Sequence, residues 1–249
     1  MQYGICNLSI VSVRAQPSHL SEMTSQLLYG EYFKILEERS QWSRIRNEFD
    51  TYEGWLEKSQ IFKISEEDFL DLSSEERSYS TDLVEHITDA AGNLTPVVVG
   101  SVLNYTAKIG HSFEGYKTSG IKDKSQIINT ALLYLNAPFL WGGKTPFGID
   151  CSGLTQMVYA LNGYCLLRDS HQQATQGEAL SFIEESEAGD LAFFDDNEGI
   201  INHVGIIMPD NYIIHVHGKV RIDRIDHSGI FNIDSKKHTH KLRVIKKII

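Results

Sequence analysis

Cys151 is the residue whose setting best suits covalent chemistry. It lies in the segment Gly148-Ile149-Asp150-Cys151-Ser152-Gly153. The apolar residues that follow recur at helical spacing and predict a helix that begins at or beside the cysteine; they are Leu154, Met157, Val158 and Leu161. Unpaired amides at a helix N-terminus favour an anion, so this position is expected to lower the pKa of the thiol. A lone cysteine is more often a small buried hydrophobe, but this setting makes Cys151 the candidate nucleophile.

Two histidines on consecutive expected strands could serve such a thiol. A cysteine peptidase needs an imidazole that accepts the thiol proton and a polar group that fixes the tautomer of this imidazole. His203 opens a strongly apolar strand, and His215 lies on the next strand, where antiparallel pairing can bring the two rings together. We therefore predict His203 as the base and His215 as its orienting partner. His217 shares a strand face with His215 and is its rival for that role.

The same side chains could hold a metal ion. His203, His215, His217 and Cys151 are a plausible ligand set for zinc. However, no Cys-x-x-Cys or His-Glu-x-x-His motif occurs, and a cysteine at a helix start is equally expected in covalent catalysis. We therefore predict neither a metal site nor a cofactor.

The composition is that of a folded, acidic protein. The chain has 249 residues, enough for one large domain or two to three small ones, and its formal net charge is -10. This charge argues against a general nucleic-acid binder and against an anionic membrane surface. No apolar run could span a bilayer, and the only cysteines are Cys6, Cys151 and Cys165. We expect a cytoplasmic protein with a small cationic or zwitterionic ligand, and the oligomeric state is left open.

Residues 1–62 read as a small β-barrel. Short strands are expected at 4–6, 10–13, 32–36, 42–46 and 53–56, separated by turn residues. An early Val13-Arg14-Ala15-Gln16-Pro17 turn precedes a Trp-x-x-Ile strand at 42–45 and a Gly-Trp-Leu strand at 54–56. This layout resembles a bacterial SH3-like domain.

The remainder divides into a middle segment and an α+β domain. Residues 65–89 are acidic and helix-favouring and 95–102 are β-rich, so 63–120 is expected to be a linker that could include a second, degenerate SH3-like barrel. In 121–249, a helical stripe at 127–135 and the Cys151 helix precede four strands, at 191–194, 203–208, 212–216 and 219–222. We predict helices packed on an antiparallel sheet, behind one or two small barrels.

Five segments together resemble the NlpC family of papain-like bacterial cell-wall peptidases, over about residues 122–226. They are Tyr134-Leu135-Asn136-Ala137-Pro138-Phe139-Leu140-Trp141-Gly142-Gly143, Asp150-Cys151-Ser152-Gly153-Leu154, Ala188-Gly189-Asp190-Leu191, His203-Val204-Gly205-Ile206 and Ile214-His215. The resemblance implies a papain-like catalytic domain in which Cys151 is the nucleophile, His203 the base and His215 the orienting residue.

Small barrels followed by this domain, with Leu167-Arg168-Asp169-Ser170-His171-Gln172-Gln173, resemble a narrower branch. This branch is the γ-D-glutamyl-L-diamino-acid endopeptidases, also called dipeptidyl-peptidase VI. The resemblance implies cleavage after the D-glutamate of murein peptides that begin with a free L-alanine, in peptidoglycan recycling or turnover. The expected partner is therefore a small murein peptide that ends in diaminopimelate or lysine.

The expected substrate-binding residues come partly from the branch and partly from their chemistry. The resemblance implies that Tyr52 and Asp150 hold the substrate's ammonium group, which would explain a carboxylate beside the nucleophile. Arg168 could meet the α-carboxylate of the D-glutamate by a bidentate contact, unless it forms a surface ion pair with Asp169. Ser170 and Gln173 could add hydrogen bonds, and Ser152, Asp169 and Trp141 complete the expected set.

Two other functions are compatible with the same residues. One is a papain-like amidase or acyltransferase that acts on another acyl group. The other is a non-catalytic murein-fragment binder in which the SH3-like domain provides recognition. A panel of peptide substrates distinguishes the first, and a thiol probe that fails to label Cys151 would favour the second.

Overall fold

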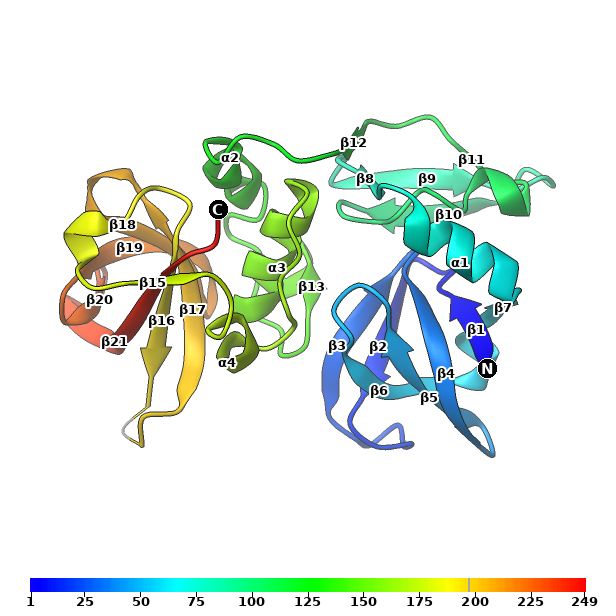
Figure 1. Ribbon diagram of the computed structural model, residues 1–249, viewed down its shortest axis with the longest axis horizontal. Coiled ribbons are helices and arrows are strands. Elements are labelled where there is room, and N and C mark those ends of the chain that lie inside the picture. Colours follow the sequence, from blue (N-terminus) through cyan, green and yellow to red (C-terminus); the bar gives the residue numbers. More distant parts are fainter. Residues whose placement is uncertain (197) are drawn as a thin grey trace. The chain divides into compact units, whose positions relative to one another are not determined.

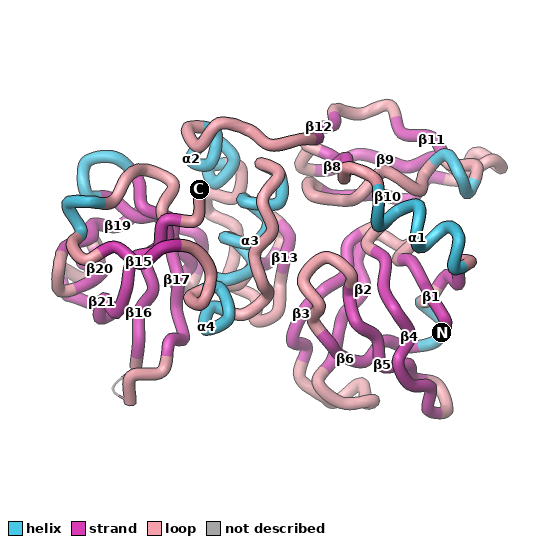
Figure 2. The backbone as a smooth tube through the Cα atoms, viewed as in Figure 1, coloured by secondary structure: helices cyan, strands magenta, loops and turns pink. Residues whose placement is uncertain are grey.

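The computed structural model describes residues 1–196 and 198–249, and it divides the chain into two compact units. The first comprises residues 1–121 together with 141–145, and the second comprises 122–140 together with 146–249. Strands dominate both units (Figure 2). None of the helices in these residues is long and apolar enough to cross a membrane. The predicted class, helices on antiparallel sheets behind a β-rich SH3-like region, is confirmed.

The N-terminal part of the first unit is a seven-stranded antiparallel sheet in the order β3-β2-β6-β5-β4-β1-β7. Alternate residues of these strands meet in one core, in which Val11, Phe33 and Ile45 are at most 1% exposed. The five expected strands are present, and two others, β3 and β7, were missed. The sequence of β3, Met-Thr-Ser-Gln-Leu-Leu, mixes polar and apolar residues without regular alternation. The strands are β1 Gln2–Ile5, β2 Ile10–Arg14, β3 Met23–Leu28, β4 Tyr32–Arg39, β5 Trp42–Asn47, β6 Glu53–Glu57 and β7 Phe62–Ile64, with a 3-10 turn at Lys58–Gln60.

The middle segment begins with a helix and continues as short strands. Helix α1 begins after Ser65, whose hydroxyl accepts a hydrogen bond from the amide of Asp68, and it ends at Ser74. The expectation of helix-favouring structure as far as residue 89 is wrong beyond this point. Pairing between strands overrides local propensity there, because β8 pairs with β12, and β9 pairs with β10 and β11. The elements are α1 Glu66–Ser74, β8 Ser78–Ser80, β9 Val84–Thr88, β10 Leu94–Val98, a 3-10 turn Ala107–Ile109, β11 Ser112–Phe113 and β12 Lys117–Ser119.

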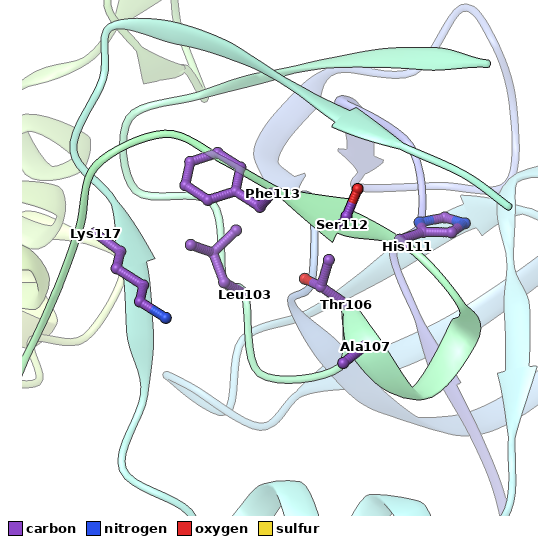
Figure 3. Close-up of a pocket in the computed structure, with 7 residues that line it drawn as sticks. All are labelled: Leu103, Thr106, Ala107, His111, Ser112, Phe113 and Lys117. Atoms are coloured by element: carbon purple, nitrogen blue, oxygen red, sulfur yellow. The ribbon is translucent and has the colours of Figure 1, made fainter. Parts of the chain in front are cut away.

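A cavity of about 350 Å³ lies in this middle segment (Figure 3). One of its polar groups, His111, is within hydrogen-bond distance of the Tyr29 hydroxyl, at 3.0 Å. The lining contains neither a cysteine nor a carboxylate. The lining residues are Leu103, Thr106, Ala107, His111, Ser112, Phe113 and Lys117.

Strand β13, Lys144–Thr145, is a short stretch from later in the chain that belongs to the first unit. The Lys144 ammonium lies 2.6 Å from the carboxylate of Glu31, and both side chains are buried. The backbone amide of Lys144 also donates to the Gln26 side chain, at 2.8 Å. Burying this pair is tolerable because each charge has a partner, whereas removing one partner would leave the other uncompensated.

The second unit places helices α3 and α4 against a closed antiparallel barrel, and α2 packs on α3. Strands β16 to β20 pair in sequence order, and β21 pairs with both β16 and β20 to close the barrel. Helices α3 and α4 pack against β17 (Figure 1). The elements are α2 Gln126–Leu132, β14 Gly148–Ile149, α3 Cys151–Leu161, α4 Ser170–Gln173, β15 Glu178–Leu180, β16 Leu191–Asp195, β17 Ile201–Met208, β18 Tyr212–His217, β19 Lys219–Asp226, β20 Gly229–Asn232 and β21 Lys237–Lys247, with 3-10 turns at Ile183–Glu185 and Pro209–Asn211.

Candidate active site

Cys151 is the first residue of α3, as the apolar spacing predicts. Asp150 is the N-cap, and its carboxylate accepts a hydrogen bond from the amide of Gly153 at 2.7 Å. The four apolar residues that predicted the helix are all buried, which fixes α3 in the core and the cysteine at its end. The half-buried Cys151 presents its Sγ 4.0 Å from the carbonyl of Asn202. The thiol therefore lies next to the backbone that flanks His203 on β17.

His203 and His215 meet across strands β17 and β18, with His203 Nε2 3.0 Å from His215 Nδ1. Gly205 lies directly opposite His215 in the strand register. A Cβ at Gly205 would come within 2.7 Å of Ile213 and 3.0 Å of His215 Cβ. The glycine of the His-Val-Gly-Ile segment therefore leaves the space through which the two rings reach each other.

The relay continues to an aspartate that the sequence analysis missed. His215 Nε2 lies 3.0 Å from Oδ2 of Asp223 on β19, and both side chains are fully buried. Arg221 donates two hydrogen bonds to this carboxylate, at 2.7 and 2.9 Å, and the amide of Ile233 donates a third at 3.0 Å. Burial favours the neutral acid, but the hydrogen bonds from His215 and Arg221 outweigh it and hold the pKa of Asp223 below its usual range. Asp223 is therefore ionised at neutral pH.

The ionised carboxylate determines the tautomer of both rings. Because Asp223 can only accept, His215 must carry its proton on Nε2 and present a lone pair on Nδ1. That lone pair accepts the proton on His203 Nε2, so His203 presents its own lone pair on Nδ1. The chain of hydrogen bonds thus leaves His203 Nδ1 as the nitrogen that can take a proton.

Both imidazoles rest in their neutral form. Burial lowers the pKa of His203 well below its ordinary value, and the neighbouring histidines lower it further. Burial also lowers the pKa of His215, although Asp223 opposes this shift. A neutral His203 is ready to act as a general base at neutral pH.

The rival residue His217 is placed outside this relay. Its ring shares the face of His215, with the centroids 6.4 Å apart, but its side chain is exposed. A different histidine, His240 on β21, stacks on His203 with a centroid separation of 4.1 Å. Local sequence does not place His240 near the relay, because only closure of the barrel brings β21 to this place.

The resting state of the thiol differs from the sequence expectation. Burial raises the pKa of Cys151 to about 12, and the charge of Asp150 adds to this shift. The amides at the start of α3 do not compensate for these effects, so the expected lowering of the thiol pKa is wrong. Cys151 rests as a thiol beside a neutral His203.

This resting state predicts the titration of the thiol. Ultraviolet absorbance of the thiolate, taken as the difference between the unchanged protein and Cys151→Ala, is expected to stay near zero at neutral pH. It should rise only above about pH 9, beyond the ordinary thiol pKa of about 8.5. The difference spectrum removes the contributions of Cys6 and Cys165. A thiolate signal already at its plateau at neutral pH would instead show a preformed thiolate–imidazolium pair.

Arg168 has a different partner from those expected. Its guanidinium is 1% exposed and donates to both oxygens of Asp150, at 3.0 and 2.7 Å, and to the Ser152 hydroxyl at 3.0 Å. The expected bidentate contact with a carboxylate is therefore made within the protein, with Asp150, and a surface ion pair with Asp169 is not what the structure shows. A buried cation accounts for the carboxylate beside the nucleophile without any ligand.

Gln173 also serves the protein rather than an open surface. Its side chain is fully buried, its oxygen accepts from the Thr155 hydroxyl at 2.7 Å, and its nitrogen donates to the carbonyls of Ser152 and Leu167. The expected hydrogen bond from Gln173 to substrate is therefore replaced by support for the first turn of α3. Asp169 caps α4, and Ser170 is buried at the start of that helix.

The two remaining predicted residues belong to the first unit. Tyr52 lies just before β6, where its amide donates to the Asp50 carboxylate at 3.0 Å, and it is half-buried. Trp141 is 60% exposed in the segment that leads to β13. Their expected contact with substrate stays a prediction.

Comparison with known proteins agrees with this architecture. The NlpC/P60 family matches residues 136–241, and the bacterial dipeptidyl-peptidase SH3 domain matches residues 13–61. The chain is 26% identical to the gamma-D-glutamyl-L-lysine dipeptidyl-peptidase of Bacillus subtilis (strain 168), over 77% of this chain and 71% of that protein. It is also 26% identical to dipeptidyl-peptidase 6 of Lysinibacillus sphaericus, over 87% of this chain and 89% of that protein.

A solved structure shows the same fold. The crystal structure of an NlpC/P60 family protein from Bacillus cereus ATCC 10987 superposes with a TM-score of 0.81 at 18% identity, over 99% of both chains. Residues 136–241, which match the NlpC/P60 family, carry Cys151, His203, His215 and Asp223, and residues 13–61 match the bacterial dipeptidyl-peptidase SH3 domain.

Proposed function

We propose that this protein is a cysteine endopeptidase that hydrolyses the γ-D-glutamyl bond to a diamino acid in short murein peptides with a free N-terminal L-alanine. The observation that carries the chemistry is the relay from Asp223 through His215 to His203, together with the Cys151 sulfur that lies 4.0 Å from the backbone carbonyl of Asn202, the neighbour of His203. NlpC/P60 peptidases are cysteine peptidases, and the names of two relatives that match most of the chain support this substrate class.

The reaction follows from the resting protonation states. The Cys151 sulfur attacks the γ-carbonyl carbon while its proton passes to Nδ1 of His203, so no stable thiolate is needed beforehand. The developing oxyanion accepts a hydrogen bond from the Cys151 backbone amide at the start of α3. His203 then returns the proton to the leaving amine, and water, deprotonated by His203, hydrolyses the thioester.

The proposed specificity depends on the substrate's ammonium group. The branch resemblance assigns this group to Tyr52 and Asp150. Because Arg168 balances the charge of Asp150, we propose that the ammonium is held by hydrogen bonds to oxygen atoms rather than by a net negative charge. A requirement for a free amine favours short released peptides over the intact wall, in which the L-alanine amine is acylated.

The test compares a free peptide with its N-acetylated form. Acetylation of L-Ala-γ-D-Glu-L-Lys should lower kcat/KM by about 10- to 100-fold, because a hydrogen bond to a charged group contributes about 1.5–3 kcal/mol. Mass spectrometry of the products reports both the rate and the bond that is cut. The matched variant Tyr52→Phe should lower the rate on the free peptide and leave the rate on the acetylated peptide unchanged.

Other results would redirect the proposal. Equal rates on the two peptides would exclude recognition of the ammonium group and favour an enzyme that acts on intact strands. Release of an amide or transfer of the acyl group, without cleavage of the γ bond, would favour the amidase or acyltransferase alternative. Peptide binding with no turnover would favour the murein-fragment binder.

A further inference from the structure

Three imidazoles gather at the His203–His215 contact of the relay. One ring nitrogen from each of His203, His215 and His240 lies within 4.8 Å of the other two. Two of these residues belong to the proposed catalytic relay, and the third comes from β21 and takes no hydrogen-bonding part in it. We propose that these three residues form a binding site for a divalent transition-metal ion, and that binding of the ion switches the peptidase off.

The donor set suits a metal ion of intermediate softness. Imidazole nitrogen is a preferred ligand of Zn²⁺, Cu²⁺ and Ni²⁺, and tetrahedral zinc with Zn–N bonds of about 2.0–2.1 Å places its ligand nitrogens about 3.4 Å apart. The 3.0 Å between His203 and His215 is already close to this separation. The His240 ring, which is stacked on His203, would have to turn its nitrogen toward the ion to complete a three-nitrogen site, and the remaining position would be left to water.

The surroundings prepare these rings to bind a cation. His203 and His215 are buried and His240 is half-buried, so packing restricts the movement of all three rings. Asp223 accepts from the outer nitrogen of His215, which is the carboxylate–histidine–metal arrangement that orients metal ligands. The Thr239 hydroxyl, 2.8 Å from His240 Nδ1, can accept a hydrogen bond from a protonated Nδ1, which leaves the lone pair of Nε2 for the ion.

The tautomers explain why the bound ion would inhibit. In the resting relay, the proton of His203 is on Nε2 and the lone pair that accepts the thiol proton is on Nδ1. A metal ion bound at Nε2 needs the lone pair there, so the proton moves to Nδ1. The imidazole stays neutral and no proton is released, but His203 no longer has a lone pair for the thiol. His215 binds the ion through Nδ1 and keeps its hydrogen bond to Asp223.

Metal binding is tested without relying on catalysis. Zn²⁺ affinity is measured by competition with a chromophoric chelator in Cys151→Ala protein, which removes the reactive thiol as a ligand. We expect one ion per chain and at least ten-fold weaker binding when His240→Phe is added, since even outer-sphere partners contribute about 10- to 100-fold. The matched control His238→Phe removes another histidine of β21, whose side chain bonds the exposed Asp226, and it should change the affinity less than about three-fold.

Inhibition is the second measurement. Of the two parts of the inference, metal binding and inhibition, only inhibition rests on the proposed function. Zn²⁺ should inhibit peptide cleavage reversibly, with activity restored by EDTA. His240→Phe should raise the Zn²⁺ concentration that halves the activity at least ten-fold, when the activity of each protein is expressed relative to its own metal-free rate. His240→Gln serves if circular dichroism shows that the phenylalanine variant is misfolded. Lack of peptidase activity on every substrate would leave the binding measurement to decide the site.

Several results would overturn the inference. The site is wrong if Cys151→Ala protein binds no Zn²⁺, because the thiol would then be the main ligand. It is also wrong if the His240 and His238 variants bind equally well or lose affinity equally. Tight binding that leaves cleavage unaffected would refute the switch, because the tautomer argument requires the two to occur together.

Discussion

Replacing Cys151 with alanine is expected to lower kcat for cleavage of the γ-D-glutamyl bond by about 10⁵- to 10⁶-fold, the range seen when a nucleophile is removed from such a unit. Alanine cannot form the thioester, and the His203 relay cannot transfer the acyl group alone. The peptide should still bind with nearly unchanged affinity, because the contacts with its amine and carboxylate do not require sulfur. Single-turnover product analysis gives the rate, and calorimetric titration gives the affinity.

Cys165 provides the matched control for this experiment. It is an exposed cysteine in the loop after α3, outside the relay, so Cys165→Ala should retain full activity. Turnover in the Cys151 variant within about 100-fold of the unchanged protein would contradict covalent catalysis, because nucleophile removal costs far more than that. Water activated directly by His203 would then be the better mechanism.

Replacing Asp223 with asparagine is expected to lower kcat by about 10²- to 10⁴-fold while KM changes little. The amide oxygen of asparagine, in the place of Oδ1, would accept from Arg221 Nη2 and the Ile233 amide. Its NH₂ group, in the place of Oδ2, would face His215, and Arg221 Nε would lose its acceptor there. His215 would then carry its proton on Nδ1 and donate it to His203 Nε2. This arrangement moves the His203 proton to Nδ1, so the base loses the lone pair that the thiol needs.

The tautomer explanation can be separated from a structural one. Asp226, an exposed aspartate on the same strand, is the matched control, and Asp226→Asn should leave kcat unchanged. Asp223 acts through His215, so the split between kcat and KM and the pH profile of kcat are the informative measurements. A kcat within about three-fold of normal would rule out this role. The role would also be ruled out if the loss of kcat were accounted for by the fraction of Asp223→Asn protein that is unfolded at the assay temperature.

The parts of the site that the sequence predicted are those fixed by local pattern. Apolar spacing placed Cys151 at the start of α3, and strand alternation placed His203 and His215 on neighbouring strands. Strand alternation places His215 and His217 on the same face, so it could not decide which of them orients His203. Burial decides between them in the structure, because His215 is enclosed with Asp223 whereas His217 is exposed.

The parts that were missed depend on contacts between distant segments. Asp223 joins the relay through the register of β18 and β19, and His240 arrives only when β21 closes the barrel. Strand β19 also carries Lys219, Arg221, Arg224 and Asp226, so its local sequence does not distinguish Asp223 from the other charged residues. The Arg168–Asp150 pair depends on the path of the loop after α3, which local sequence does not specify, and its burial reverses the role expected for Arg168.

The position of Lys144 has a consequence for how such proteins can be recombined in evolution. The stretch 141–145 lies between α2 and the nucleophile along the chain, yet it belongs to the N-terminal unit and buries a lysine against Glu31. Exchange of residues 1–121 for an unrelated domain would remove Glu31 and leave the Lys144 ammonium without its partner, seven residues before the start of α3. Because residues 141–145 belong to the N-terminal unit, a successful swap must replace them as well.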